Sequence, residues 1–135
     1  MSQENVEILH RQADAVNRRD ADAFAATLSA DVEWEDSAFW TEDARLWRGR
    51  ASVRDWFNQF ILEPWETIRA EVEEIIETTE NRVFFAVLLT ARGKDSGAEI
   101  RQRFWAVYWI THGEVSCRRV FRERIEALEA AGLSE

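Results

Sequence analysis

The stretch Asp31-Val-Glu-Trp-Glu-Asp36 decides the fold, because the hydrophobic pattern changes here from a helical period to a period of two. Val32, Trp34 and Asp36 share one face of the expected strand, and the two glutamates share the other. A carboxylate on the apolar face costs free energy unless it is paired or neutralised. Asp36, expected on the concave face beside Trp34, is therefore the first candidate for a functional residue.

Helical periodicity flanks this strand on both sides. Two helices are expected before it, over residues 3–19 and 21–28, with Asp20 as the N-cap of the second. A third helix follows Gly49, where apolar residues recur at intervals of three and four, and Pro64 ends it.

The second half of the chain predicts a four-stranded meander and a short amphipathic helix at the C-terminus. The strands are expected at about 66–77, 82–91, 98–110 and 114–121. The third of them, Phe104-Trp-Ala-Val-Tyr-Trp-Ile110, is apolar on both faces, so both faces must be covered. We expect Trp105 to face inward and Phe104, Ala106 and Tyr108 to face outward, where they predict a homodimer interface.

Together these elements predict an α+β fold, in which a strongly curved antiparallel sheet packs with three N-terminal helices and encloses a pocket. The 135 residues fit one domain, 1–135. Seven tryptophans exceed what a core of this size requires. We expect Trp34, Trp56, Trp105 and Trp109 to line the pocket, with Trp40 and Trp47 on a loop over its mouth.

The charge pattern limits the partners. A net charge of −9 argues against nucleic acid and anionic membranes as partners. Cys117 is the single cysteine, which excludes an intrachain disulfide and favours a cytoplasmic location. The N-terminal residues lack the apolar segment of a signal peptide, so none is expected. An aromatic pocket favours a small apolar molecule as ligand.

Two arginines are candidates for stabilising charge in the pocket. Strand parity associates Arg103 with Trp105 and Arg118 with Val120, and an inward arginine suits a carboxylate, an enolate or an oxyanion. Each could instead pack its stem and extend its charged head into solvent.

The remaining chemistry-bearing residues predict no site. His112 is expected in an exposed turn and His10 on the flank of a helix. Cys117 is expected to pack as a small hydrophobe. The histidines and the cysteine have no metal-ligand spacing, and no glycine-rich phosphate loop occurs, so neither a metal nor a cofactor is expected.

The chain resembles the SnoaL-like branch of the nuclear transport factor two-like superfamily over nearly its full length. Four stretches carry the resemblance: Glu4-Asn-Val-Glu-Ile8, Asn17-Arg-Arg-Asp20, Asp31-Val-Glu-Trp34 and Trp47-Arg-Gly-Arg50. The C-terminal Glu126-Ala-Leu-Glu-Ala-Ala-Gly-Leu133 is similar to the ending common in actinobacterial members. The resemblance implies a cone-shaped fold with a bent sheet, and usually a homodimer, but it leaves the chemistry to the site.

The resemblance also allows known catalytic sets to be compared with this chain. Ketosteroid isomerases of the superfamily place their catalytic aspartate where Asp36 falls, and their oxyanion donors where Gln12 and Trp105 stand. Limonene epoxide hydrolases use an Asp–Arg–Asp set, in which Arg103 could supply the arginine but Trp105 replaces an aspartate. Polyketide cyclases use a late-sheet aspartate, which the last strand, Val115 to Phe121, lacks. No set transfers whole.

Three hypotheses stay open from the sequence. The first is a cofactor-independent isomerase, cyclase or hydrolase, in which Asp36 moves a proton and Arg103 or Arg118 stabilises charge. The second is a protein that binds an apolar ligand without turnover. The third is a dimeric scaffold with no ligand. In the last two, Asp36 would be held ionised by an arginine for structural reasons alone.

Overall fold

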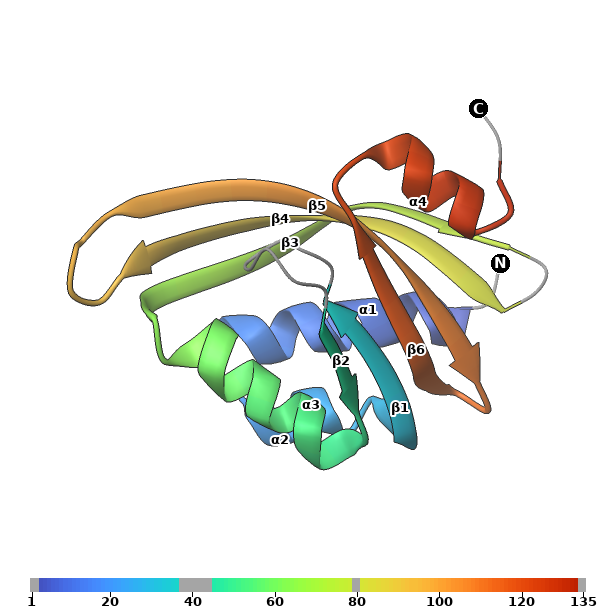
Figure 1. Ribbon diagram of the computed structural model, residues 1–135, viewed down its shortest axis with the longest axis horizontal. Helices are drawn as coiled ribbons and strands as arrows, with labels where there is room; N and C mark the ends of the chain where they lie inside the picture. The colour runs from blue at the N-terminus through green and yellow to red at the C-terminus, as the bar shows by residue number, and fades with distance from the viewer. Residues whose placement is uncertain (1–2, 37–44, 79–80, 134–135) are drawn as a thin grey trace.

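The computed structural model describes residues 3–36, 45–78 and 81–133. The elements are α1 (Gln3–Asn17), α2 (Ala21–Ala25), β1 (Leu28–Asp36), β2 (Arg45–Arg48), α3 (Arg50–Trp56), the π-helix η1 (Phe57–Leu62), β3 (Trp65–Glu77), β4 (Arg82–Gly93), β5 (Glu99–Thr111), β6 (Glu114–Phe121) and α4 (Arg124–Ala130). The expected α+β fold is confirmed: a strongly curved, open sheet packs with the three N-terminal helices (Figure 1).

Within the described residues, the sheet has six strands in the order β2-β1-β6-β5-β4-β3, one more than expected. The additional strand is β2, which pairs antiparallel with β1 and lies within the segment expected to be a loop. β1 and β6 run parallel, and the other neighbours are antiparallel. β3 is irregular between Trp65 and Thr67 and again between Val72 and Glu74, and such bulges bend a strand and increase its twist.

Local sequence explains how the helices are placed. The Asp20 carboxylate accepts a hydrogen bond from the backbone N–H of Ala23 at 3.0 Å, so the expected N-cap of α2 is confirmed. Gly49 precedes α3 with a φ of 88°, a conformation that favours glycine. The third helix continues from α3 into η1 and ends just before Pro64, as expected.

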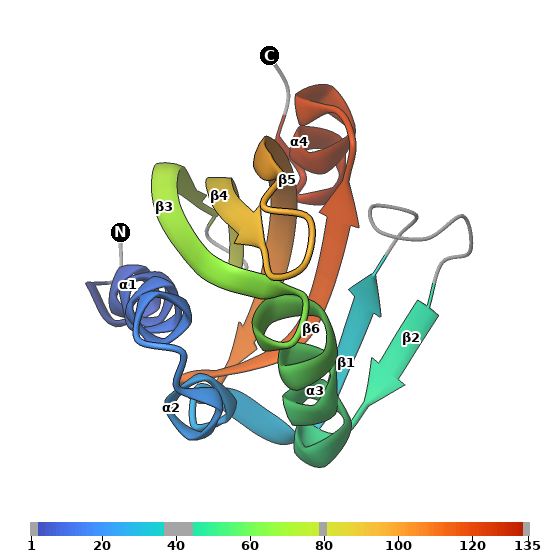
Figure 2. The same cartoon turned by 90° about the vertical axis from the view of Figure 1, so that its left-hand side faces the viewer.

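Helices cover the two faces of the sheet unequally. Helices α1, α2 and α3 lie on the concave side, whereas α4 packs across the opposite, convex side (Figures 1 and 2). Arg124 fixes the start of α4 to β3 by donating to both carboxylate oxygens of Glu74, at 3.2 and 2.8 Å. At the other end of α4, Arg82 donates a hydrogen bond to the carbonyl oxygen of Ala130 at 3.3 Å. The chain thus supplies its own cover for part of the convex face.

The two faces of β5 are the reverse of what we expected. Ala106 and Tyr108 are buried in the main core on the concave side. Trp105 and Trp109 are half-buried in a smaller cluster under α4. A strand that is apolar on both faces satisfies either orientation, so parity within β5 could not choose between them. The expected dimer residues Phe104, Ala106 and Tyr108 therefore do not form the outer face.

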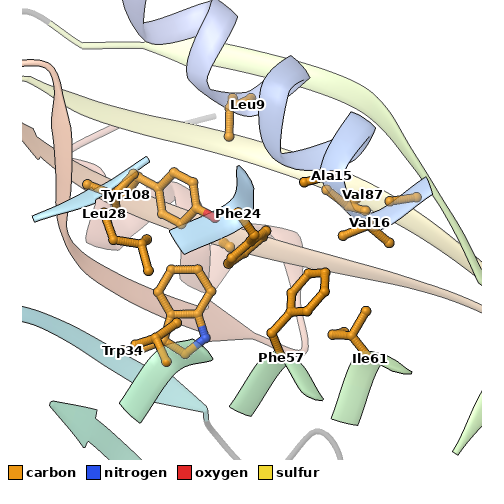
Figure 3. Close-up of a cluster of buried hydrophobic side chains, with 14 of the residues drawn as sticks. Leu9, Ala15, Val16, Phe24, Leu28, Trp34, Phe57, Ile61, Val87 and Tyr108 are labelled. Carbon is orange, nitrogen blue, oxygen red and sulfur yellow. The ribbon is translucent and has the colours of Figure 1, made fainter. Parts of the chain in front are cut away.

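The main core fills the concave side and brings distant segments together. Leu9 and Val16 of α1, Phe24 of α2, Trp34 of β1 and Tyr108 of β5 converge there (Figure 3). The rings are in direct contact: the centroids of Phe24 and Trp34 lie 5.7 Å apart, and those of Trp34 and Tyr108 5.8 Å apart. In the described part of the chain, every helix is too short or too polar to cross a lipid bilayer.

Candidate functional site

A pocket lies within this core, between the concave face of the sheet and the N-terminal helices. Its cavity has a volume of about 70 Å³, and its wall is mostly apolar. The expected wall residues Trp34 and Trp56 do line it, and their ring centroids are 5.2 Å apart. The polar exceptions in the wall are Gln12, Asp36, Tyr108 and Arg118. Such a pocket suits a ligand that is largely apolar and carries a few polar groups.

Asp36 and Arg118 form a buried ion pair in the pocket wall. Asp36 is the last residue of β1, and Arg118 lies on β6 as the register partner of Trp34. Nη2 of Arg118 donates to Oδ1 of Asp36 at 3.2 Å, and the indole nitrogen of Trp56 donates to Oδ2 at 3.1 Å. The two side chains are only 5% and 10% exposed, so both charges are removed from water and depend on each other.

Arg118 is also held by the tryptophans. Its guanidinium carbon lies 4.1 Å from the ring centroid of Trp34 and 4.9 Å from that of Trp56, which are cation–π distances. Burial lowers the pKa of Arg118 below its ordinary value, and the charge of Asp36 opposes that shift. Nε of Arg118 is buried and has no hydrogen-bond partner among the described residues. One N–H donor of a buried cation thus stays unsatisfied beside the cavity.

Trp105 and Trp109 are not in the pocket, contrary to our expectation, and Arg103 follows the second alternative, with its charged head in solvent. All three lie on the convex face, because inward parity on β5 belongs to Phe104, Ala106 and Tyr108. Arg103 donates to Glu73 through Nε at 2.5 Å and through Nη2 at 3.1 Å. Its side chain is 47% exposed, so this is a surface ion pair. Trp109 stacks with Arg82, whose guanidinium carbon lies 5.7 Å from the ring centroid.

The two tryptophans expected over the mouth have different outcomes. Trp40 lies outside the described residues. Trp47 lies on β2, half-buried, with its ring centroid 6.0 Å from that of Phe60 in an edge-on arrangement. It lies on a strand and not on the expected loop, and it is not among the described residues that line the cavity.

The other chemistry-bearing residues lie away from the pocket. Cys117 is half-buried on β6, and burial together with the charges of Glu33 and Glu35 raises the pKa of its thiol, which keeps it protonated. His112 occupies the exposed turn between β5 and β6, and His10 is exposed on α1. Within the described ranges, no three His, Cys, Asp or Glu side chains come together to hold a metal ion.

The polar wall residues beside the ion pair were not predicted as site residues. Tyr108 donates a hydrogen bond to Oε1 of Gln12, and Gln12 in turn contacts Thr27. Burial raises the pKa of Tyr108 well above its ordinary value, so the phenol stays neutral. In the sequence, Gln12 is distinguished only by the resemblance, since an oxyanion donor of ketosteroid isomerases falls at this position. Tyr108 was assigned to the wrong face, although as the sole tyrosine of the chain it was a distinctive residue.

An open, bent sheet wrapped around α1–α3, with a pocket inside the cone, defines the nuclear transport factor two-like class of folds. The model of the SnoaL-like domain family matches residues 9–117, so the chain belongs to that family. No curated protein matches the chain in sequence.

Solved structures show the same fold at low sequence identity. Rv0760c from Mycobacterium tuberculosis, in complex with estradiol-17beta-hemisuccinate, has a TM-score of 0.77 and 16% identity, covering 90% of this chain and 95% of that chain. The Delta 5-3-ketosteroid isomerase from Mycobacterium sp. has a TM-score of 0.76 and 18% identity, covering 93% and 97%. Bal32a, from a soil-derived mobile gene cassette, has a TM-score of 0.77 and 19% identity, covering 95% of each chain. These identities establish a shared fold and leave function to the site.

Proposed function

We propose that the pocket binds a small, largely apolar molecule with an acidic or carbonyl oxygen directed at Arg118, and that Asp36 transfers a proton of that molecule. The observation that carries this proposal is the Asp36–Arg118 pair in the wall of an otherwise apolar cavity. A buried ion pair is often no more stabilising than apolar residues of the same volume. Its presence beside a cavity therefore favours a role in binding or chemistry.

The pair suits a proton transfer next to a carbonyl group. The C–H bond of the ligand would break, its proton would bind a carboxylate oxygen of Asp36, and the electron pair would move onto the carbonyl oxygen. The buried N–H groups of Arg118 would stabilise the resulting enolate oxygen. Return of the proton to another carbon would complete an isomerisation without a cofactor.

A second candidate is binding without turnover. Both carboxylate oxygens of Asp36 already accept hydrogen bonds, from Arg118 and Trp56, which favours a structural role for this carboxylate. The cavity volume of about 70 Å³ adds a size limit, because an engineered cavity that takes benzene measures roughly 150 Å³. A larger ligand would have to move wall side chains or extend out through the mouth.

Binding can be measured by tryptophan fluorescence, because the tryptophans divide between the two faces. Titration with small carboxylic acids and ketones should quench the emission, and the quench should shrink when Trp34 or Trp56 becomes Phe. Trp105→Phe and Trp109→Phe are matched controls on the convex face and should preserve it. Absence of any spectral change across such a panel would leave only the scaffold hypothesis.

Turnover can be tested without knowing the natural substrate. The purified chain would be incubated in deuterated water with β,γ-unsaturated ketones and keto acids, and deuterium incorporation would be followed by NMR. Asp36→Asn keeps the shape of the side chain but cannot accept the proton, so it should retain binding and lose exchange. Exchange that persists in Asp36→Asn would exclude Asp36 as the base, and binding with no exchange in either protein would favour the second candidate.

The homodimer and the cytoplasmic location stay predictions. Because α4 covers Trp105 and Trp109, a dimer contact on the convex face would have to use α4 or the part of the sheet beyond it. Sedimentation at micromolar concentration should give twice the chain mass of 15.8 kDa, and a clean monomer would contradict the dimer.

A further inference from the structure

A chain of buried hydrogen bonds connects α2 to the pocket through α1. The hydroxyl of Thr27 donates to the backbone carbonyl of Phe24 at 2.7 Å. Nε2 of Gln12 donates to that same hydroxyl oxygen at 2.8 Å. The hydroxyl of Tyr108 then donates to Oε1 of Gln12. Thr27, Gln12 and Tyr108 are only 2%, 5% and 3% exposed, so water does not compete for these bonds.

The direction of every bond in this chain follows from its first member. A backbone carbonyl can only accept, so the single hydroxyl proton of Thr27 is used on Phe24. Thr27 must then accept from Gln12, which places the amide nitrogen of Gln12 toward Thr27. The amide oxygen consequently faces Tyr108, and Tyr108 has to donate its only hydroxyl proton to it.

Tyr108 therefore has no proton left to give to a ligand, and its oxygen can only accept. The ring lies in the pocket wall, and its hydroxyl points toward Phe24, another residue of that wall (Figure 3). A ligand hydroxyl or N–H placed against this oxygen would form a hydrogen bond. A ligand carbonyl or ether oxygen in the same position would meet an acceptor and repel it.

We propose that Tyr108 is a specificity-determining residue that accepts a hydrogen bond from the ligand, so that the pocket selects small hydroxy acids with the acid at Arg118 and the hydroxyl at Tyr108. The proposal rests on the proposed binding function. Tyr108 and Arg118 are direct cross-strand partners, and both lie against the indole of Trp34. Arg118 and Tyr108 are thus neighbours in the pocket wall, so the acid and the hydroxyl of the ligand must lie close together.

The test compares ligands that differ only in the ability to donate. Calorimetric titration would use 2- and 3-hydroxypropanoate, their methoxy counterparts and propanoate, which respect the size limit set by the cavity of about 70 Å³. At the substituent position that binds best, the hydroxy acid should bind about tenfold more tightly than the methoxy acid, because a methoxy oxygen accepts but cannot donate. Tyr108→Phe should remove that difference, because phenylalanine has no oxygen that can accept the hydrogen bond.

The same experiment separates this inference from the proposed function. Binding of propanoate with no benefit from a hydroxyl at any position would overturn the role of Tyr108 and leave the pocket as a ligand site. Equal weakening of hydroxy and methoxy acids by Tyr108→Phe would do the same. No binding by any member of the panel would overturn both proposals.

A second variant tests the direction of the chain. Thr27→Val removes the hydroxyl that orients Gln12, so the amide is free to turn and Tyr108 can donate to a ligand. The preference for hydroxy over methoxy acids should then fall from about tenfold to about twofold. NMR provides a readout without any ligand: the side-chain amide protons of Gln12 should show cross-relaxation with the methyl group of Thr27. Cross-relaxation with the ring of Tyr108 instead would show the reverse orientation and overturn the proposal.

Discussion

The two faces of β5 differ in how they use the same kind of residue. On the concave face, Phe104 and Tyr108 surround a cavity together with a buried ion pair. On the convex face, Trp105 and Trp109 pack under α4, and the cluster there consists of apolar side chains. The larger rings of β5, those of the two tryptophans, thus lie on the face without the candidate site. Buried charge next to a cavity, and not the abundance of tryptophan, therefore distinguishes the functional face of this sheet.

Breaking the ion pair should have the largest effect. Arg118→Met would leave Asp36 as a buried carboxylate without its cation and should lower the free energy of unfolding by about 3–5 kcal/mol. Chemical denaturation measures this change. The double variant Asp36→Asn/Arg118→Met should recover at least half of the loss, because no uncompensated charge remains. If Arg118→Met were as stable as the wild type, the buried carboxylate of Asp36 would not depend on Arg118 for its stabilisation.

On the convex face, the free energy of unfolding should depend on apolar packing and not on charge. Leu128 of α4 is 3% exposed, and Leu128→Ala should lower the free energy of unfolding by about 2–4 kcal/mol. Ile125 on the same helix is 49% exposed, so Ile125→Ala should stay within about 0.5 kcal/mol of the wild type. Ligand affinity of the folded protein should be unchanged in both variants. Loss of binding in Leu128→Ala would show that the two faces are coupled.

The sequence predicted most of the architecture because long periodic segments are unambiguous. The period-two pattern of 31–36 correctly placed Trp34 and Asp36 on the buried face, and Asp20 correctly marked the start of α2. The strand β2 was missed because four residues, Arg45–Arg48, are too short to show a period.

The site was harder to predict, because it depends on which face of each strand is inside. On β6, Arg118 shares its face with the apolar Val120, and the arginine does line the pocket. On β5, apolar residues occupy both faces, so Trp105 was expected to face inward and the position of Arg103 stayed open. The face could have been chosen only by knowing that α4 covers the other side. Contacts between elements distant in sequence, and not local pattern, decided the outcome.

Alkaline pH should test the burial of Tyr108, the only tyrosine of the chain. Its folded-state pKa is raised by burial, so the unfolded chain ionises first, above a pKa of about 10. Stability contributed by the neutral phenol is complete below that pH and falls above it, by up to about 1.4 kcal/mol per pH unit. Tyr108→Phe should lack this component, whereas other groups titrate equally in both proteins.

Absorbance provides a direct check on the alkaline behaviour. Tyrosinate absorption near 295 nm should appear in the wild type only together with loss of the circular dichroism signal of the folded protein. Ionisation of the tyrosine at about pH 10 in a protein that stays folded would contradict a phenol sealed in the pocket wall.

The smallest effect is expected at Arg103, which makes it the sharpest control for the ion pair at Arg118. Both arginines contact a carboxylate through guanidinium nitrogens, but the Arg103 side chain is 47% exposed and the Arg118 side chain only 5%. Water and salt already solvate Arg103 and Glu73, so Arg103→Met should leave the denaturation midpoint within experimental scatter. It should also leave ligand affinity unchanged, because Arg103 lies on the convex face. The same substitution thus tests burial alone, with the chemistry held constant. If Arg103→Met weakened binding while Arg118→Met did not, the ligand site would lie on the convex face and the assignment of the concave pocket would be wrong.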